Sequence, residues 1–471
     1  MGVELFNQEN QALGRGFLER YFFSNWRLPR EKRNLNFDQL ELIVSPLCSH
    51  ACAYCYINRF KDELYPIELR DEEKIVEHAA LVIDWLIQEG LSPNIDFFSG
   101  APLEQRVCFE VLEMMLERYA QAEARVRPER IVVPTPYSFL LSEELTERVE
   151  RLIAGFAELG IRFALSASFD GKYCEQFRPL AYAKEGPLSD GYLFRAEPDA
   201  RDDAFYDKCF AFNKKHGFGF HPMLYARAMP YWKENFLWFQ ENFKKHGIPP
   251  FALYLLEVRN QNWTEEQIWL LGEFIDFIIR WAWKLCKEDL SQFESFLFKK
   301  RGFNILSSPL TTTGRGLGCS KQSMLYLRLG DLAIVPCHRE MYKGEEYGFL
   351  RLKRERGKVE CEIEITNPEK LIGYYSFDAD AWPYCETCVL KYSCSHGCTG
   401  SQLENMGDPF TPIPTVCKME HYKVYREVRT FQELGIYEAI TRRLSPQVKA
   451  GLDLLLELGS RAEPNEIRFR S

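Results

Sequence analysis

Between about residues 39 and 288, short runs of β-like sequence alternate with amphipathic helical segments. Apolar residues in Glu72–Gln88 recur at helical spacing, and Thr264–Leu285 repeats the pattern. This alternation predicts a parallel sheet with helical crossovers, in which ligands bind at the carboxyl ends of the strands. The expected strands are Gln39–Ser45, Asn94–Phe98, Arg130–Pro134, Ile161–Ser168, Phe218–Tyr225 and Phe251–Arg259.

Three cysteines follow the first expected strand directly. Cys48, Cys52 and Cys55 form a Cys-x3-Cys-x2-Cys run with Tyr54 before the third cysteine. Thiolates select zinc, Cu(I) or iron–sulfur clusters. Three ligands leave one iron of a four-iron cluster open, and an open metal position is typical of a catalytic centre. A structural zinc loop is the alternative.

The cysteine spacing, Tyr54 and the preceding strand together resemble the radical S-adenosylmethionine (SAM) enzymes. The resemblance implies a partial (β/α)6 TIM-like barrel. It also implies that the open iron binds the amino and carboxylate groups of SAM, with Tyr54 against the adenine. An electron from the cluster then cleaves SAM to a 5′-deoxyadenosyl radical.

Other expected strand ends match the family's SAM contacts only in part. Phe98-Ser-Gly-Ala-Pro102 stands where Gly-Gly-Glu-Pro is usual, and Thr135-Pro-Tyr137 stands for Thr-Asn-Gly. Ser168, followed by Asp170-Gly171 and Arg178, is close to the family's Ser-x-Asp-Gly plus Arg. Plain strand-to-helix turns are the alternative for these loops. The implied SAM contacts are Tyr54, Ser99, Gly100, Thr135, Ser168 and Arg178.

A second cysteine-rich region follows an expected hairpin of residues 325–329 and 332–335. Its Cys-x2-Cys-x5-Cys-x3-Cys run, with an outlying cysteine on either side, resembles the SPASM extension of radical SAM enzymes, which holds two auxiliary four-iron clusters. Zinc ribbons are the alternative, although they close with four ligands in two pairs. The resemblance implies a distal cluster on Cys385, Cys388, Cys394 and Cys417 and a cluster nearer the active site on Cys319, Cys337 and Cys398.

The nearer cluster departs from the fully ligated pattern. Leu325 stands where such enzymes have a further cysteine. The cluster therefore either keeps an open iron, able to bind a substrate thiolate or amide, or is closed by Cys361.

Composition limits the possible partners and the compartment. The 471 residues carry a formal charge of -9 without long single-sign runs, which argues against nucleic acid as a partner. No signal-peptide pattern and no apolar segment of membrane-spanning length is present, so the chain is expected in the cytoplasm and without a membrane partner. Fifteen cysteines in short regular groups favour metal ligands over disulfides there.

The expected fold is α/β, with the partial barrel followed by a small cysteine-rich α+β SPASM domain. The first 38 residues form an extension that leaves no room for a leader-binding domain. The expected domains are 1–38 (extension), 39–288 (radical SAM barrel), 289–310 (bridge), 311–430 (SPASM) and 431–471 (C-terminal helices).

The resemblance implies an enzyme that modifies a peptide or protein, with three four-iron clusters and SAM as cofactors. A ribosomal-peptide maturase forming a thioether or carbon–carbon crosslink is the first hypothesis. The alternatives are a formylglycine-forming sulfatase-maturing enzyme, which would have aspartate where this chain has His338, a peptide epimerase, a backbone-excising enzyme or a small-molecule dehydrogenase. An iron–sulfur electron carrier that does not cleave SAM is the hypothesis from another class.

Three candidate catalytic residues remain. His338 could deprotonate a substrate near neutral pH. Glu257 and Arg259, at the tip of the sixth expected strand, either face the substrate or form a rim ion pair. An external electron donor of flavodoxin or ferredoxin type is expected, and a separate leader-peptide-binding protein is a further possible partner.

Overall fold

The structure is a computed structural model that describes residues 11–180, 191–193, 201–259, 263–299, 303–311 and 324–461. The chain divides into two compact units. The first comprises Met1–Ser168, Arg178–Phe218 and Ser320–Ser376, and the second comprises Phe169–Phe177, Gly219–Cys319 and Phe377–Ser471. Each unit is therefore assembled from segments far apart in the sequence.

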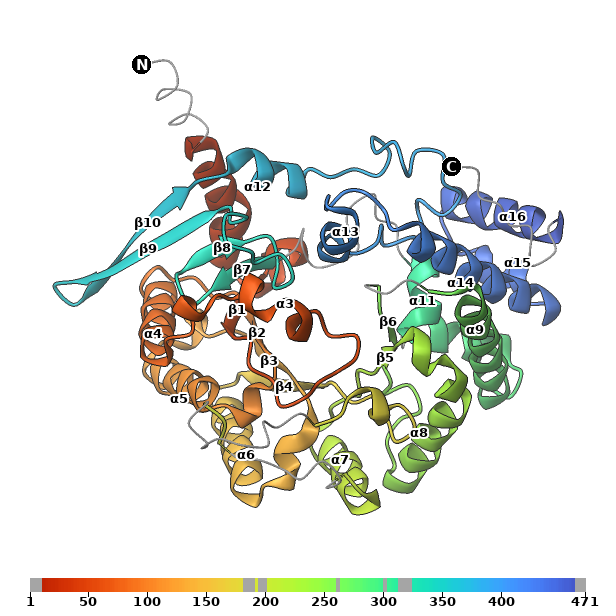
Figure 1. The fold of residues 1–471 in the computed structure, drawn as a ribbon, viewed down its shortest axis with the longest axis horizontal. Helices are drawn as coiled ribbons and strands as arrows, with labels where there is room; N and C mark the ends of the chain where they lie inside the picture. The colour runs from red at the N-terminus through yellow and green to blue at the C-terminus, as the bar shows by residue number, and fades with distance from the viewer. Residues whose placement is uncertain are drawn as a thin grey trace. The chain divides into compact units, whose positions relative to one another are not determined.

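An eight-stranded mixed sheet forms the centre of the first unit (Figure 1). Its strand order is β10-β9-β8-β7-β1-β2-β3-β4. Strands β1 to β4 are parallel, as the alternating pattern predicts, and β7–β8 forms the expected hairpin. The strands are β1 (Gln39–Ser45), β2 (Asn94–Ser99), β3 (Arg130–Thr135), β4 (Arg162–Ala167), β7 (Met324–Arg328), β8 (Ala333–Val335), β9 (Gly348–Glu355) and β10 (Lys358–Ile365).

Strand β1 is bonded on both sides. It pairs in parallel with β2, Gln39 facing Asn94, and in parallel with β7, Gln39 facing Met324. Six of its seven residues are buried, which fits a strand covered on both faces. The pairing of β1 with β7, which the alternating pattern did not predict, joins the region after residue 320 to the first unit.

Helices of the first unit follow the strands as crossovers. In α4 (Glu72–Gln88), whose bounds match the sequence prediction, the Asp71 side chain caps the first turn by accepting from the Lys74 N–H. The buried face of α4 carries Ile75, Ala79, Val82 and Leu86 at helical spacing. The helices are α2 (Ser24–Trp26), α3 (Tyr56–Leu64), α4, α5 (Arg106–Gln121), α6 (Glu143–Glu158), α7 (Asp203–His216) and α12 (Pro368–Tyr375).

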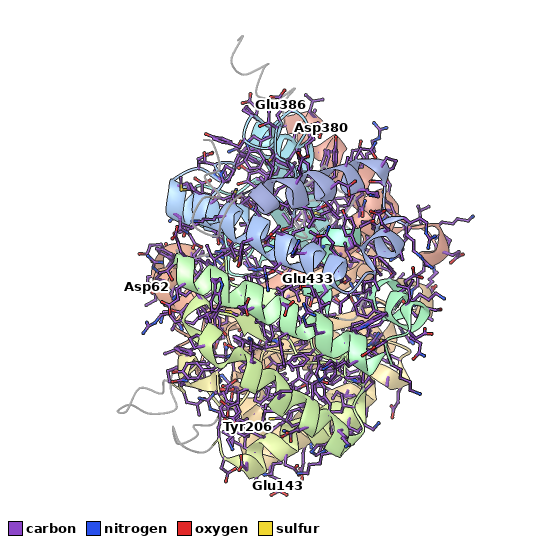
Figure 2. The ribbon with its side chains drawn as sticks, turned by 90° about the vertical axis from the view of Figure 1, so that its right-hand side faces the viewer. Asp62, Glu143, Tyr206, Asp380, Glu386 and Glu433 are labelled. Carbon is purple, nitrogen blue, oxygen red and sulfur yellow. The ribbon has the colours of Figure 1, made fainter. Side chains whose placement is uncertain are left out.

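The second unit is mainly helical. Helices α9 and α14 pack side by side, and Figure 2 labels Glu433 at the end of α14, where it pairs with Arg280 of α9 at 2.5 Å. A capping box of Thr264 and Gln267 begins α9. The helices are α8 (Trp232–His246), α9 (Glu265–Leu285), α10 (Leu290–Glu294), α11 (Asn304–Thr311), α13 (Thr399–Met406), α14 (Pro414–Glu433), α15 (Tyr437–Thr441) and α16 (Pro446–Arg461).

The fifth and sixth expected strands are much shorter than predicted. Only β5 (Met223–Leu224) and β6 (Leu256–Glu257) are regular, and they form a separate two-stranded parallel sheet. The Met223 N–H donates to the Asp170 carboxylate at 2.8 Å. This backbone donor is therefore not used for pairing with a neighbouring strand. Within the described residues, one continuous six-stranded parallel sheet is therefore not formed.

The Asp170-Gly171 turn, which resembles part of a SAM motif, has a structural role in the second unit. Gly171 has φ of +91°, and a Cβ there would lie 2.5 Å from Phe239 and 2.6 Å from Asn235. Asn235 also donates to the Asp170 carbonyl at 2.7 Å. Glycine is needed here for both its conformation and its size.

Among the helices that the structure describes, none combines the length and the apolar character that crossing a bilayer requires.

Candidate functional site

The cysteine loop begins where β1 ends, and two backbone bonds tie it to the loop after β2. The Gly100 N–H donates to the Ser45 carbonyl at 3.2 Å, and the Ala101 N–H donates to the Leu47 carbonyl at 3.0 Å. A Cβ on Gly100 would overlap the Leu47 oxygen and lie 2.6 Å from the Cys48 Cβ. Gly100 is thus a glycine because the cysteine loop lies directly on it.

Gln105, which the sequence reasoning missed, joins the same two loops. Its side-chain N–H group donates to the carbonyls of Leu47 at 2.6 Å and Ala101 at 3.0 Å, and to the Ser99 hydroxyl at 3.1 Å. Both Gln105 and Ser99 are buried. The Ser99 side chain therefore helps to hold the loops together.

Glu104 was also missed, and it lies completely buried below the cysteine loop. Its carboxyl accepts from the Ser138 hydroxyl and is hydrogen-bonded to Ser49, next to Cys48. Burial raises the pKa of Glu104 to about 7, although the two serines act to lower it. An acidic residue two positions after a Pro in a loop gives no sequence signal for such burial.

The three thiols of the loop lie close to one another and are only partly exposed. Burial raises the pKa of Cys48 well above its usual range, and the nearby Cys52 and Cys55 raise it further. Burial also raises the pKa of Cys55, whereas backbone N–H groups and the cations Arg178 and Arg339 act to lower it. Without a metal Cys48 and Cys55 stay protonated, and metal binding would displace their protons. A soft triad with two guanidinium groups nearby fits an anionic iron–sulfur cluster.

The remaining expected SAM contacts lie around this edge of the first unit. Tyr54 is half-buried in the turn between Cys52 and Cys55. The Thr135 hydroxyl donates to the Pro136 carbonyl at 2.9 Å, and the Thr135 carbonyl accepts from the Ser168 N–H at 2.9 Å. Arg178 is buried and close enough to act on Cys55. SAM contact by Ser99, Gly100, Thr135, Ser168 and Arg178 stays a prediction.

His338 follows Cys337 and lies over the middle of the sheet. Its Nδ1 is 2.8 Å from Glu41 Oε1, and its ring stacks on Phe98 at 4.2 Å between centroids and 5° between planes. Its side chain remains 33% exposed, so one side of the ring can meet a substrate.

Tyr56 links the cysteine loop to the Cys337 region. Its ring stacks with His338 at 6.1 Å and lies under the Arg339 guanidinium at 4.9 Å. Burial raises the pKa of Tyr56 well above its usual range, and Cys55 and Cys337 both act in the same direction. Cysteines from the two sequence motifs are therefore neighbours of one side chain within the first unit.

The second unit brings the four expected distal ligands together. Burial raises the pKa of Cys417 to about 11, with Cys388 as the next cause. Burial likewise raises the pKa values of Cys385 and Cys394 to about 12, and Cys417 contributes to both shifts. Cys417, at the start of α14, is thus close to the other three.

His421 is a further residue of this cysteine group that the sequence reasoning missed. Its Nε2 lies 3.3 Å from the Cys388 sulfur. His421 stands four residues after Cys417 on α14, on the same side of the helix. The four-residue spacing from Cys417 was the sequence signal that could have identified His421.

Glu257 and Arg259 are part of a buried ion-pair network. Glu257 Oε1 is 2.5 Å from the Lys423 ammonium, and Arg259 pairs with Glu420 at 2.7 Å. Although burial acts to lower it, Glu420 and Glu257 raise the pKa of Arg259. Arg259 also donates to the Gly397 carbonyl at 3.3 Å and to the Ser395 hydroxyl. Of the two alternatives, the contacts favour an ion pair, which here fixes the Cys394–Cys398 loop.

The expected nearer cluster is only partly described. Cys319 lies outside the described residues, Cys337 belongs to the first unit, and Cys398 immediately precedes α13 in the second. In β9, Leu352 pairs with Cys361 and Gly348 pairs with Ile334, which shortly precedes Cys337. Leu352 and Gly348 are four positions apart along the strand. Four strand residues span about 13 Å. Cys361 is therefore too far from Cys337 to close that cluster.

Sites for a single metal ion are a separate matter from clusters. In the described ranges, no three His, Cys, Asp or Glu side chains form a group that could hold a metal ion. A zinc site needs its thiolates around one ion at about 2.3 Å. The ligands of an iron–sulfur cluster bind different irons and need not meet at one point.

No family model and no curated protein matches the chain. Among solved structures, histidine-tagged anSMEcpe with bound AdoMet matches at a TM-score of 0.48 and 13% identity, over 83% of this chain and 98% of that chain. Streptococcus suis SuiB bound to S-adenosylmethionine matches at 0.40 and 12%, over 81% and 77%. SuiB bound to the precursor peptide SuiA matches at 0.41 and 10%, over 87% and 80%. At these values the function of this chain has to be argued from its own residues.

Replacing Gly100 by alanine should remove the iron of the cluster that Cys48, Cys52 and Cys55 are expected to hold. The new Cβ would overlap the Leu47 carbonyl and Cys48, so the loop must move. Overpacking of this kind costs about 1 to 3 kcal/mol. Iron analysis of anaerobically reconstituted protein measures the loss. Gly373→Ala in α12, where nothing lies within 4 Å of the new Cβ, is the control and should keep all its iron. Full iron in Gly100→Ala would contradict the packing argument.

Glu104→Gln should remove part of the pH dependence of stability. Burial raises the pKa of Glu104 to about 7 in the folded protein. The free energy of unfolding therefore falls as the pH rises from the usual carboxyl range to about 7. The neutral variant should avoid a loss of about 3 kcal/mol between pH 5 and 8. Urea unfolding of the apoprotein at several pH values measures this. Glu117→Gln, at an exposed position of α5, should behave as wild type. Identical pH slopes for Glu104→Gln and wild type would refute the assignment.

Lys423→Met should strongly destabilise the chain. It leaves Glu257 and Glu420 buried with Arg259 as their remaining cation. Breaking a buried pair costs about 3 to 5 kcal/mol. Lys418→Met on the same helix breaks the exposed Lys418–Glu265 pair and should cost about 0 to 1 kcal/mol. Chemical unfolding compares the two, and equal costs would show that the network does not matter.

Proposed function

We propose that this chain is a radical SAM enzyme with a SPASM region that modifies a peptide, and specifically a ribosomal-peptide maturase forming a thioether or carbon–carbon crosslink. One observation carries the proposal. The loop of Cys48, Cys52 and Cys55 lies at the carboxyl end of β1, packed on Gly100 and beside Arg178. That edge is where open α/β sheets bind ligands.

The cysteine groups have separate roles in the proposal. Cys48, Cys52 and Cys55 hold the first four-iron cluster, and Cys385, Cys388, Cys394 and Cys417 hold the distal auxiliary cluster. Cys337, with Cys319 and Cys398, holds the nearer auxiliary cluster, and an open iron there is favoured because Cys361 is distant. When bound, these groups supply the reductive cleavage of SAM to a hydrogen-abstracting 5′-deoxyadenosyl radical and an acceptor for the electron left on the substrate.

The chain's own side chains bind and position the reactants. Arg178 is a cation beside Cys55 and would pair with the SAM carboxylate, for which a guanidinium fork is well suited. Tyr54, Ser99, Gly100, Thr135 and Ser168 complete the proposed SAM site. His338 takes the substrate proton as the new bond closes, so that hydrogen abstraction, bond formation, proton loss and electron loss balance.

Reconstitution of the purified protein tests the proposal. Wild type should bind about twelve irons with matching sulfide, and a triple Cys48→Ala, Cys52→Ala, Cys55→Ala variant about eight. After reduction, wild type should convert SAM to 5′-deoxyadenosine and the triple variant should not. Mössbauer spectra identify the cluster type.

Different results would support different alternatives. Twelve irons without 5′-deoxyadenosine would favour an iron–sulfur electron carrier. Four irons or fewer, or stoichiometric zinc, would refute the three-cluster assignment. A peptide substrate would then be sought only if SAM cleavage is observed.

A further inference from the structure

Two acidic side chains lie side by side in the buried sheet of the first unit. Glu41 of β1 and Asp96 of β2 are partners in the parallel register. Glu41 is buried, and Asp96 Oδ1 is enclosed without a hydrogen-bond partner among the described residues. Burying carboxyl groups in a sheet costs stability unless they gain partners. Such a pair therefore calls for an explanation.

The partner of Glu41 is His338. The imidazole Nδ1 lies 2.8 Å from Glu41 Oε1. An ionised carboxylate only accepts hydrogen bonds, so this contact requires a proton on Nδ1. In the neutral ring Nε2 is then the atom with the free lone pair.

Aromatic neighbours fix the plane of the same ring. Phe98 stacks on it at 4.2 Å and 5° between planes, and Tyr326 meets it edge-on at 6.0 Å and 70°. Within the described residues, Nε2 of His338 has no hydrogen-bond partner. The imidazole is therefore held by one nitrogen and by the rings of Phe98, Tyr326 and Tyr56, with its other nitrogen left for a ligand.

Of the two carboxyl groups, Asp96 is the one that favours the neutral form, which leaves the negative charge on Glu41, the partner of His338. Burial raises the pKa of Asp96 to about 7, and the neighbouring Glu41 raises it further, whereas Arg130 and His338 act to lower it. Two adjacent carboxylates cannot easily both be ionised. A neutral Asp96 leaves Glu41 as the acceptor for Nδ1.

We propose that Glu41 is a positioning residue that fixes the Nδ1–H tautomer of His338 and thereby presents a basic Nε2 to the substrate. The inference rests on the proposed function, in which His338 takes the substrate proton. It adds a residue outside the cysteine and SAM motifs, and it assigns a reason for a glutamate between the apolar residues of β1. Asp96 supports Glu41 and does not itself contact the imidazole in this arrangement.

The test is direct-detected ¹⁵N NMR of reconstituted, oxidised holoenzyme labelled at its histidines, recorded at a pH where the ring is neutral. His338→Gln identifies the signal. Wild type should show a protonated Nδ1 and an unprotonated Nε2. Glu41→Leu should shift the proton largely to Nε2. Asp96→Asn, which imitates the neutral acid, should keep the wild-type pattern.

Each outcome decides the proposal. A wild-type spectrum in Glu41→Leu, or an Nε2–H form in wild type, would overturn it. Because Glu41→Leu could disturb folding, Glu41→Gln is measured as well and should give a mixture of tautomers, since an amide can both donate and accept. A Glu41→Gln spectrum identical to that of wild type would also contradict the proposed role of the negative charge on Glu41.

SAM cleavage without substrate separates this inference from the proposed function. Wild type should form 5′-deoxyadenosine from SAM in the absence of a peptide, a reaction that precedes proton transfer to His338. Absence of cleavage in wild type would refute the proposed function, whereas the tautomer result stands by itself. With an identified peptide, Glu41→Leu should lower kcat at least tenfold and leave KM within about twofold.

Discussion

The first unit depends on the double pairing of β1. Parallel bonds to β2 on one side and to β7 on the other place this strand inside the sheet. The cysteine loop leaves its carboxyl end, and Glu41 lies in its middle. Because β7 continues into β8 and then Cys337 and His338, pairing with β1 is what brings these residues beside Glu41 and Tyr56. Local sequence patterns do not predict this contact, because the two strands come from distant parts of the chain.

What could be predicted from the sequence was mostly local. The bounds of β1 and α4 were predicted to the residue, because apolar runs, caps and turn residues act over a few positions. The fifth and sixth strands were overestimated because their apolar content is used to pack against helices and rings rather than to extend a ladder. The cysteine spacings predict the distal group, and Cys417 lies near enough to Cys385 and Cys394 to raise their pKa values; their role as cluster ligands stays a prediction. Gln105, Glu104 and Glu41 were missed because their roles arise only when distant loops and strands meet.

Polar residues in buried positions proved more informative than the degenerate motif residues. Ser99 and Thr135 use their hydroxyls on neighbouring groups of the protein, Gln105 and the Pro136 carbonyl. Gln105, through the Leu47 carbonyl, and Glu104, through Ser49, instead hold the cysteine loop on the loop after β2. The close approach of Gly100 and the hydrogen bonds of Gln105 thus fix the loop after β2 without an acidic side chain at Ala101.

Charge is used differently in the two units. In the second unit, Arg259, Lys423, Glu257 and Glu420 neutralise one another, and the network ties the end of β6 to α14 and to the Cys394–Cys398 loop. Each of these four charges has a partner, which is the arrangement expected of a structural clamp. The buried Glu427 beside Lys423 is different, because neither of its carboxyl oxygens has a hydrogen-bond partner among the described residues. The carboxyl pair of Glu41 and Asp96 in the first unit is not balanced in this way. One oxygen of Asp96 has no hydrogen-bond partner among the described residues, and Glu41 contacts the partly exposed imidazole of His338. An imbalance of that kind costs stability, and it is therefore at His338, more than at Glu257 or Arg259, that the fold indicates chemistry.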